Sequence, residues 1–168
     1  MTNKIQKLTD NEVVYLAGFL DGNGSICAKL VKDKTSKYKY AIRVEICFSL
    51  KKNRRFFLMQ WQKKLGCGKL ILAKNSPERT VDNLTIGEFN KVRELLVKLK
   101  CHFQIKKGQA KLAIDIIENY YRKKDISLEQ FCLICKKIDK LTALNDSEKK
   151  EGSITGASVI KELRTNYS

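Results

Sequence analysis

The sequence predicts an α+β protein whose elements follow the order αββαββα, with two further helices toward the C-terminus. Apolar residues recur every three or four residues in several segments, which is typical of amphipathic helices. Between these segments apolar and polar residues alternate, which is typical of half-buried strands. The 168 residues include 43% hydrophobic ones, enough for the core of one domain. We therefore expect a single domain over residues 1–168.

The first helix is expected to begin near Asp10. Thr9 and Glu12 have the spacing of a capping box, and an apolar run follows them. After Gly24 the apolar spacing changes from helical to alternating, so we expect this helix to lead directly into a strand.

Gly18 and Gly22 fall on one face of this helix, beside Tyr15 and Phe19. Each glycine inside a helix costs about 1 kcal/mol relative to alanine. Close helix packing would offset that cost, because a face without Cβ atoms lets a second helix approach closely. The plainer alternative is that Gly22 and Gly24 end the helix and open a turn.

A hairpin is expected next, with its loop at residues 32–39. Its first strand has Ile26, Ala28 and Leu30 on one face. Its second strand has an apolar face of Ile42, Val44, Ile46, Phe48 and Leu50, and a mixed face of Ala41, Arg43, Glu45, Cys47 and Ser49. The mixed face is either a solvated sheet surface or a ribbon in a DNA major groove, where arginine reaches guanine and glutamate accepts from cytosine.

Residues 51–65 return to helical spacing, and Gly66 is placed to end that helix as its C′ residue. The first turn of the expected helix contains four cations: Lys51, Lys52, Arg54 and Arg55. Cations have the unfavourable sign for this end of the helix dipole. Phosphate groups bound opposite the turn would offset this repulsion. The alternative is that the four side chains are simply solvated and bind nothing.

A second hairpin is expected over residues 69–86, with its turn at 75–79. On its first strand we expect Leu70 and Leu72 to face the core, opposite Lys69, Ile71 and Ala73. On its return strand we expect Asn83 and Thr85 to share a face opposite Leu84 and Ile86.

From residue 88 onward the spacing is helical. The apolar positions of the first two helices are Phe89, Val92, Leu96 and Leu99, and then Ala113, Ile116, Ile117 and Tyr120. Ser127 and Gln130 have the spacing of a capping box for a third helix.

The chain is strongly basic, with 34 Lys+Arg against 18 Asp+Glu and a net charge of +16. This excess predicts a polyanionic partner. We expect that partner to be nucleic acid rather than a membrane, because the sequence has no apolar run of transmembrane length and no signal-like N-terminus.

Among the cysteines, only Cys132 and Cys135 have metal-type spacing. One such pair cannot make a structural zinc site by itself. Together with Leu128 and Phe131 they follow helical spacing, so we expect both thiols on the buried face of a helix, in a reducing compartment.

Residues 16–24 read Leu-Ala-Gly-Phe-Leu-Asp-Gly-Asn-Gly. This string resembles the signature of the LAGLIDADG homing endonucleases, and the wider chain resembles their single-motif, homodimeric branch, which organellar group I introns encode. The similarity covers about residues 10–150, and it implies that these residues form the core of the domain, followed by a basic tail at residues 151–168. It implies a saddle-shaped, four-stranded antiparallel sheet that covers DNA, with helices behind it, and a homodimer in which signature helices pack together. Residues expected at that dimer interface are Tyr15, Gly18, Phe19 and Gly22.

The resemblance also implies an active site that is partly kept and partly changed. Arg54 and Lys106 stand at the positions of the family's basic residues, which organise water and stabilise charge at the phosphate. Leu50 stands where the family has a glutamine. Asn23 stands where it has the aspartate that binds the catalytic metal, Mg²⁺, and Gly22 lies beside it in that implied metal site.

Asn23 predicts strongly impaired cleavage. Magnesium prefers carboxylate oxygens, and an amide offers only a neutral carbonyl. At ~4 Å and an effective dielectric of about 20, the lost charge removes about 8 kcal/mol of attraction to a divalent ion before solvation is counted. Because Asn and Asp are nearly isosteric, we expect folding and DNA binding to survive.

The residues expected to bind DNA are Lys29, Arg43, Glu45, Cys47, Ser49, Lys69, Asn83, Thr85, Ser147, Lys149 and Lys150. The strand residues would lie against the major groove, whereas Lys149 and Lys150 would meet phosphates. A twofold dimer demands a near-palindromic duplex site.

Two functional classes stay open. One is a site-specific, intron-encoded DNA endonuclease, a hydrolase of phosphodiester bonds, inactivated at Asn23. The other is a non-cleaving binding module on the same fold, such as an intron maturase or a DNA-binding regulator. A ribosome-like RNA-binding protein would explain the charge but not the signature. The resemblance implies an organellar location, most plausibly the chloroplast, with synthesis inside the organelle.

Overall fold

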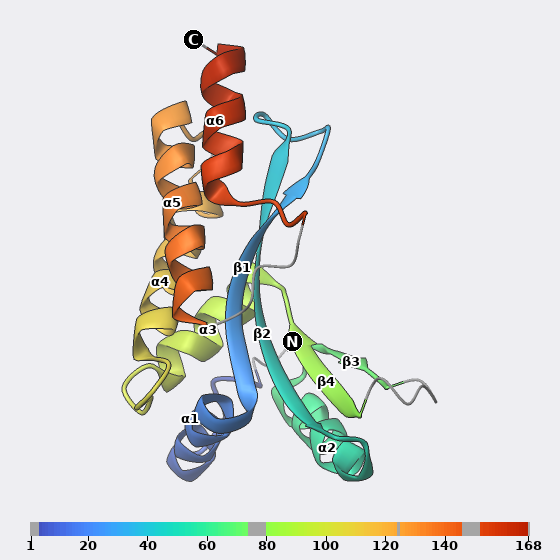
Figure 1. The fold of residues 1–168 in the computed structure, drawn as a ribbon. Helices are drawn as coiled ribbons and strands as arrows, with labels where there is room; N and C mark the ends of the chain where they lie inside the picture. The colour runs from blue at the N-terminus through green and yellow to red at the C-terminus, as the bar shows by residue number, and fades with distance from the viewer. Residues whose placement is uncertain (1–3, 74–79, 124, 146–151, 168) are drawn as a thin grey trace. The chain divides into compact units, whose positions relative to one another are not determined.

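The computed structural model describes residues 4–73, 80–123, 125–145 and 152–167 (Figure 1). Contacts divide the chain into two compact units, which are described separately. The first unit comprises Met1–Ile26 and Glu45–Lys107, and the second comprises Cys27–Val44 and Gly108–Ser168. The prediction of a single domain with a distinct tail stays a prediction.

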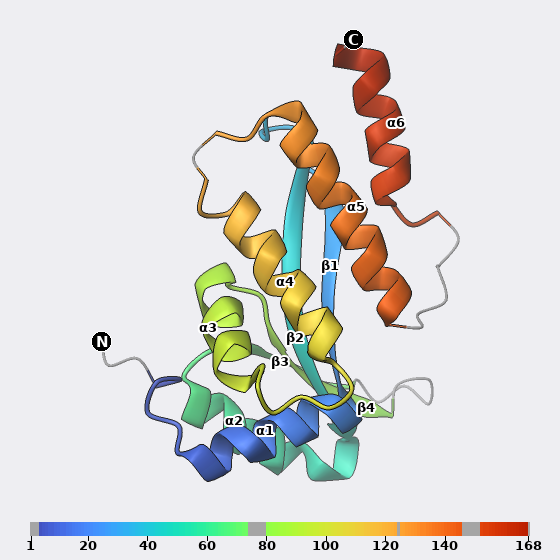
Figure 2. The same ribbon diagram turned by 90° about the vertical axis from the view of Figure 1, so that its left-hand side faces the viewer.

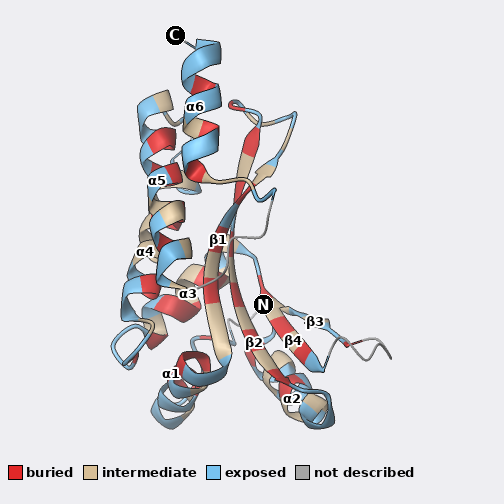
Figure 3. Ribbon diagram, viewed as in Figure 1, coloured by how far each residue is buried: buried red, intermediate tan, exposed pale blue. Residues whose placement is uncertain are grey.

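The strands form one four-stranded sheet, and they run over Gly24–Lys32 (β1), Tyr40–Lys51 (β2), Lys69–Ile71 (β3) and Val81–Ile86 (β4). Their order is β1-β2-β4-β3, and β4 is antiparallel to both β2 and β3. Burial alternates along β1 and β2 as predicted, which Figure 3 shows as alternating colours. On β4, Asn83 and Thr85 share the less buried face, which confirms that prediction too.

Among its described residues, the first unit carries the α-helices Asp10–Asn23 (α1), Arg55–Leu65 (α2) and Phe89–Leu99 (α3). The capping box of Thr9 and Glu12 is present, and α1 packs against α3. Gly66 ends α2 with a positive φ of 67° and donates its N–H to the Gln62 carbonyl, as the C′ assignment predicted.

The predicted start of α2 at residue 51 is wrong. Strand β2 continues to Lys51, a 3-10 turn (η1) occupies Lys52–Arg54, and α2 begins at Arg55. Lys51 is held in the strand by its pairing with Val81, and Lys52 donates its backbone N–H to the Thr80 carbonyl. The cationic segment therefore spans a strand end and a tight turn rather than one helical turn.

The predicted orientation of Leu72 and Ala73 is also wrong. Leu72 is exposed and Ala73 is buried, because β3 ends at Ile71 and the alternation stops there. The Ala73 N–H instead donates to the Asp82 carboxylate at 2.7 Å. A buried acceptor, not a strand partner, sets the direction of the chain at this point.

The second unit carries the helices Lys107–Tyr120 (α4), Leu128–Leu144 (α5) and Gly156–Tyr167 (α6), the first of which starts at the boundary between the units. Figure 2 shows α4 and α5 side by side. Cys132 and Cys135 lie on the buried face of α5, as predicted, and burial raises the pKa of the Cys135 thiol to about 12. The capping box of Ser127 and Gln130 is also present.

Helix α6 was not predicted, because residues 151–168 were expected to form a basic tail. That expectation is wrong in charge too, since the segment has two basic and two acidic side chains. It packs against α5, and Asp139 of α5 accepts the backbone N–H groups of Gly156 and Ala157 at 2.7 and 2.9 Å. Gly156 is required there, since a Cβ atom would overlap the Cys135 carbonyl. A carboxylate from another helix thus caps α6.

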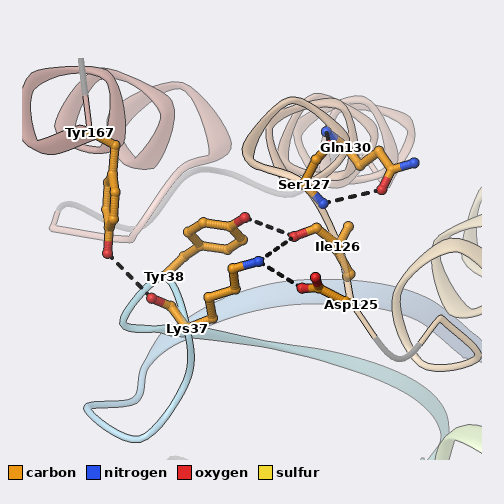
Figure 4. Close-up of polar contacts among 7 residues, drawn as sticks. All are labelled: Lys37, Tyr38, Asp125, Ile126, Ser127, Gln130 and Tyr167. Carbon is orange, nitrogen blue, oxygen red and sulfur yellow. Dashed lines mark hydrogen bonds and ion pairs between the residues drawn. The ribbon is translucent and has the colours of Figure 1, made fainter.

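The loop between β1 and β2 is anchored within the second unit (Figure 4). Tyr38 donates its hydroxyl to the Ile126 carbonyl at 2.7 Å, and Lys37 donates to Asp125 at 2.6 Å. Tyr167 of α6 donates to the Lys37 carbonyl at 3.3 Å.

In the part of the chain that the structure describes, none of the helices is both long and apolar enough to cross a membrane.

Candidate functional site

An open pocket of about 500 Å³ lies at the C-terminal end of α1, within the first unit. The α1–β1 junction, the end of β2, the η1 turn and the start of β4 form its walls. Its lining residues are Gly22, Asn23, Gly24, Ser25, Ser49, Leu50, Lys51, Arg54 and Val81. The structure therefore brings Asn23, Gly22, Leu50 and Arg54 of the predicted active site together around one pocket.

Of the three glycines in and after the second half of α1, only one is required by the packing of a single chain. A Cβ atom on Gly24 would lie 2.8 Å from the Cys47 carbonyl oxygen, so the chain passes too close to β2 for any side chain. A Cβ atom on Gly18 or Gly22 would meet no atom within 4 Å. The fold of one chain therefore requires Gly24, but it gives no packing reason for Gly18 or Gly22.

Lys106 is positioned by the signature helix itself. The Asp21 carboxylate accepts the backbone N–H groups of Gln104, Ile105 and Lys106 at 2.7, 3.3 and 2.9 Å. In return the Lys106 ammonium donates to the Asp21 carbonyl at 2.7 Å. This cation meets one of the carbonyls left free at the C-terminal end of α1, where no basic residue of the helix itself is present.

The environment of Asp21 favours its charged form. Burial alone would raise the pKa of this carboxyl, but the three N–H donors and the Lys106 charge together lower it below its ordinary value. Asp21 is therefore a fixed acceptor and is not free to bind a metal. Sequence reasoning missed this role, although Asp21 is one of the two acid-type positions of the signature.

An ion pair lies beside the wall of the pocket that η1 and the start of β4 form. Asp82 is fully buried and accepts from Arg55 Nε at 2.8 Å and from its Nη2 at 3.3 Å. The Arg55 guanidinium lowers the pKa of Asp82, against the effect of burial. Their sequence neighbours, Val81 and Arg54, both line the pocket, so the ion pair ties together the two backbone segments that carry them. Sequence reasoning missed this pair because its members lie 27 residues apart.

The pocket fits an anion better than a divalent cation. Its charged lining residues are the exposed Lys51 and Arg54, and the described residues of its lining include no carboxylate. Mg²⁺ binds mainly through carboxylate oxygens, so the donor set of this chain does not fit it. Among the described residues, no group of three His, Cys, Asp or Glu side chains is placed to hold a metal. A phosphate group matches the charge of the pocket.

The predicted DNA-binding residues of the strands lie on the less buried face of the sheet. Lys29, Arg43 and Lys69 are exposed. Glu45, Cys47, Ser49, Asn83 and Thr85 are partly exposed. Ser147, Lys149 and Lys150 lie outside the described residues. Their roles toward DNA stay predictions.

The outer face of α1 is apolar. Val14 is 51% exposed and Tyr15 is 50% exposed, in line with the open surfaces of Gly18 and Gly22. On α2, Phe56 and Met59 are also exposed, at 72% and 49%. Tyr15 stacks on Trp61 with ring centroids 5.8 Å apart, and Phe19 packs on Phe48, so both aromatic residues also have partners within the first unit.

The sequence pattern of the LAGLIDADG endonuclease family matches residues 16–101. The DNA endonuclease I-CreI of Chlamydomonas reinhardtii is 30% identical over 152 residues, which is 90% of this chain and 90% of the relative. The chain belongs to the LAGLIDADG homing endonuclease family. The DNA endonuclease I-CvuI of Chlorella vulgaris is 33% identical over 137 residues, 81% of each chain.

LAGLIDADG structures also confirm the fold. A crystal structure of I-CvuI matches with a TM-score of 0.79 at 28% identity, over 93% of this chain and 94% of that one. That structure holds I-CvuI in complex with the I-CreI target in 2 mM Mg, with the DNA not cleaved. The family match at residues 16–101 includes Asn23, Leu50 and Arg54, whereas Lys106 follows it in the sequence.

Proposed function

We propose that this protein is a site-specific DNA-binding homing endonuclease that binds its duplex as a homodimer and whose cleavage is disabled at Asn23. The observation that carries the proposal is the pocket at the end of the signature helix, which Asn23 lines together with Lys51 and Arg54, and whose described lining residues include no carboxylate. The relatives are DNA endonucleases, and the solved I-CvuI structure contains a DNA target.

In this proposal the residues of the chain have distinct tasks. Lys51 and Arg54 bind a backbone phosphate in the pocket, and Arg54 stabilises negative charge that develops there. Lys106, held at the end of α1 by Asp21, supplies a third cation. A magnesium ion would supply Lewis acidity and an activated water in a relative with a carboxylate at this position, but the donor set of this chain does not fit it. We propose an organellar location by analogy with the relatives.

A non-cleaving module, such as a maturase or a regulator, is the second candidate, and Asn23 is the observation that favours it. Lys106 does not decide between the two, because its contact with the Asp21 carbonyl gives it a structural reason to be present. Arg54 is the better indicator of an endonuclease, since its exposed side chain lines the pocket at the end of the signature helix.

The experiment that tests the proposed function is a selection from a pool of randomised duplexes. We expect the protein to enrich one near-palindromic sequence spanning about two helical turns, because a twofold dimer presents the same sheet face to each half-site. Sequencing of the bound fraction measures the enrichment. If the protein bound all duplexes with the same affinity, and that affinity depended on salt concentration but not on sequence, site-specific binding would be contradicted.

Gly18→Ala should change folding stability and dimerisation in opposite directions. Because a Cβ atom at Gly18 meets no atom within 4 Å in one chain, alanine should stabilise the helix by about 1 kcal/mol. The same methyl group would separate two signature helices that pack face to face, so the dimer should weaken. Urea unfolding measures the first effect, and sedimentation at micromolar concentration measures the second.

Gly18→Leu, with its larger side chain, should abolish the dimer while the chain still folds. A matched control is Val14→Leu on the same outer face of α1, which adds one methylene to a residue that already has a side chain. A wild-type protein that sediments as a stable monomer with and without DNA would contradict the homodimer.

A further inference from the structure

Four polar side chains form a hydrogen-bonded row across β2 and β4 on the less buried face of the sheet. In the strand register Cys47 is opposite Thr85, and Ser49 is opposite Asn83. Thr85 Oγ1 donates to Cys47 Sγ at 3.8 Å, Cys47 Sγ lies 3.6 Å from Ser49 Oγ, and Ser49 Oγ donates to Asn83 Oδ1 at 2.8 Å. All four residues belong to the first unit.

The row has a direction. A serine hydroxyl has one proton, and that of Ser49 is donated to Asn83 Oδ1, so Ser49 Oγ is the acceptor in its contact with Cys47. The Cys47 thiol therefore donates to Ser49 and accepts from Thr85. Every proton in the row points toward Asn83, and each bond polarises the next.

The hydrogen bond from Ser49 sets which end of the Asn83 amide faces β2. Its oxygen is turned toward Ser49, so its Nδ2 group is turned away from β2. In the described part of the chain no buried side-chain nitrogen or oxygen is left without a partner. Because Nδ2 makes no hydrogen bond to the described residues, this amide nitrogen is at least partly accessible to solvent. Asn83 thus presents two N–H donors outward and keeps its acceptor oxygen within the sheet.

We propose that Asn83 reads guanine in the major groove, through an amide that Ser49 holds in a donor-only orientation. This inference rests on the proposed function, in which this face of the sheet contacts DNA. An unrestrained asparagine pairs with adenine, because it can donate to N7 while its oxygen accepts from the N6 amino group. Guanine instead presents two acceptors, O6 and N7, which match the outward donors of Asn83.

The test is a duplex selection with the full-length protein and three variants. Wild type should prefer guanine at one base pair in each half-site, and Asn83→Ala should reduce that preference about tenfold. Ser49→Ala should move the preference at the same base pair from guanine toward adenine, because it frees Asn83 Oδ1. Ser49→Thr is the matched control, since it keeps a hydroxyl at this position and should keep guanine.

The outcomes separate this inference from the proposed function. Selection of a specific site by wild type, together with unchanged guanine preference in Ser49→Ala, would overturn the inference and leave site-specific binding standing. Selection of a specific site with no base pair affected by Asn83→Ala would overturn it as well. Failure of wild type to select any sequence would overturn the proposed function and this inference with it.

Discussion

Asn23→Asp is expected to produce a protein that cuts both strands of its target in the presence of magnesium. The change places a carboxylate in the pocket beside Gly22 and Arg54, and carboxylate oxygen is the ligand that magnesium prefers. If about half of the 8 kcal/mol attraction estimated for this charge survives solvation, the cleavage rate should rise about a thousandfold. The side chain is nearly isosteric, so affinity for DNA should change little.

The measurement is linearisation of a plasmid that carries the selected site, with and without magnesium. A matched control is Ser25→Asp, which adds the same charge to the lining of the same pocket at a position that does not replace the signature residue. We expect the control to stay inactive. Efficient magnesium-dependent cutting by the unmodified protein would show that other groups hold the metal, and the proposed inactivation would then be wrong.

Asp21→Asn is expected to destabilise the protein by about 2 kcal/mol and to lower turnover in the Asn23→Asp background. The carboxylate accepts three backbone N–H groups, and an amide in its place turns a donor toward at least one of them. The loop that carries Lys106 would lose its anchor at the end of α1. Urea unfolding at neutral pH measures the loss of stability.

The acid dependence of stability gives an independent readout. The folded-state pKa of Asp21 lies below its ordinary value of 3.8. Its stabilising contribution is therefore complete above pH 3.8 and is lost as the pH falls through the lower, folded-state pKa. Asp21→Asn should make the unfolding free energy less dependent on pH in that acidic range, relative to wild type.

Two comparisons make the Asp21 prediction specific. Asp125→Asn removes an exposed carboxylate that pairs with Lys37, and such a surface pair should cost no more than about 1 kcal/mol. Lys106→Met in the Asn23→Asp background should lower the rate of the bound complex with little effect on DNA affinity. A fully stable Asp21→Asn protein would show that the loop at residues 104–106 has another anchor.

Local sequence patterns were sufficient for the elements whose signals lie within a few residues. The capping boxes at Thr9 and Ser127, the glycine that ends α2, and the alternation along β2 each depend on residues in the same turn or strand. The signature at residues 16–24 placed Asn23 at the end of a helix by the same local logic. Covalent spacing sets these features before any tertiary contact forms.

Prediction failed where a distant partner decided the local structure. The buried Asp82 carboxylate accepts the Ala73 N–H, which places Ala73 in the interior. The pairing of β2 with β4 extends the strand to Lys51, where a helical turn was expected. Helix α6 depends on Asp139, which lies 17 residues away in α5. No local pattern contains these partners.

The sequence by itself determined the family, the α+β element order and the candidate positions Asn23, Arg54 and Lys106. Only the tertiary structure decided that the Asp21 carboxylate accepts the backbone N–H groups of the Lys106 loop and that Ser49 orients Asn83. It also showed that the described lining of the pocket combines two cations with no acid. The physical reason is that hydrogen bonds and burial depend on distances in space, and segments far apart in the chain come together only when the apolar faces of the helices and the sheet are buried.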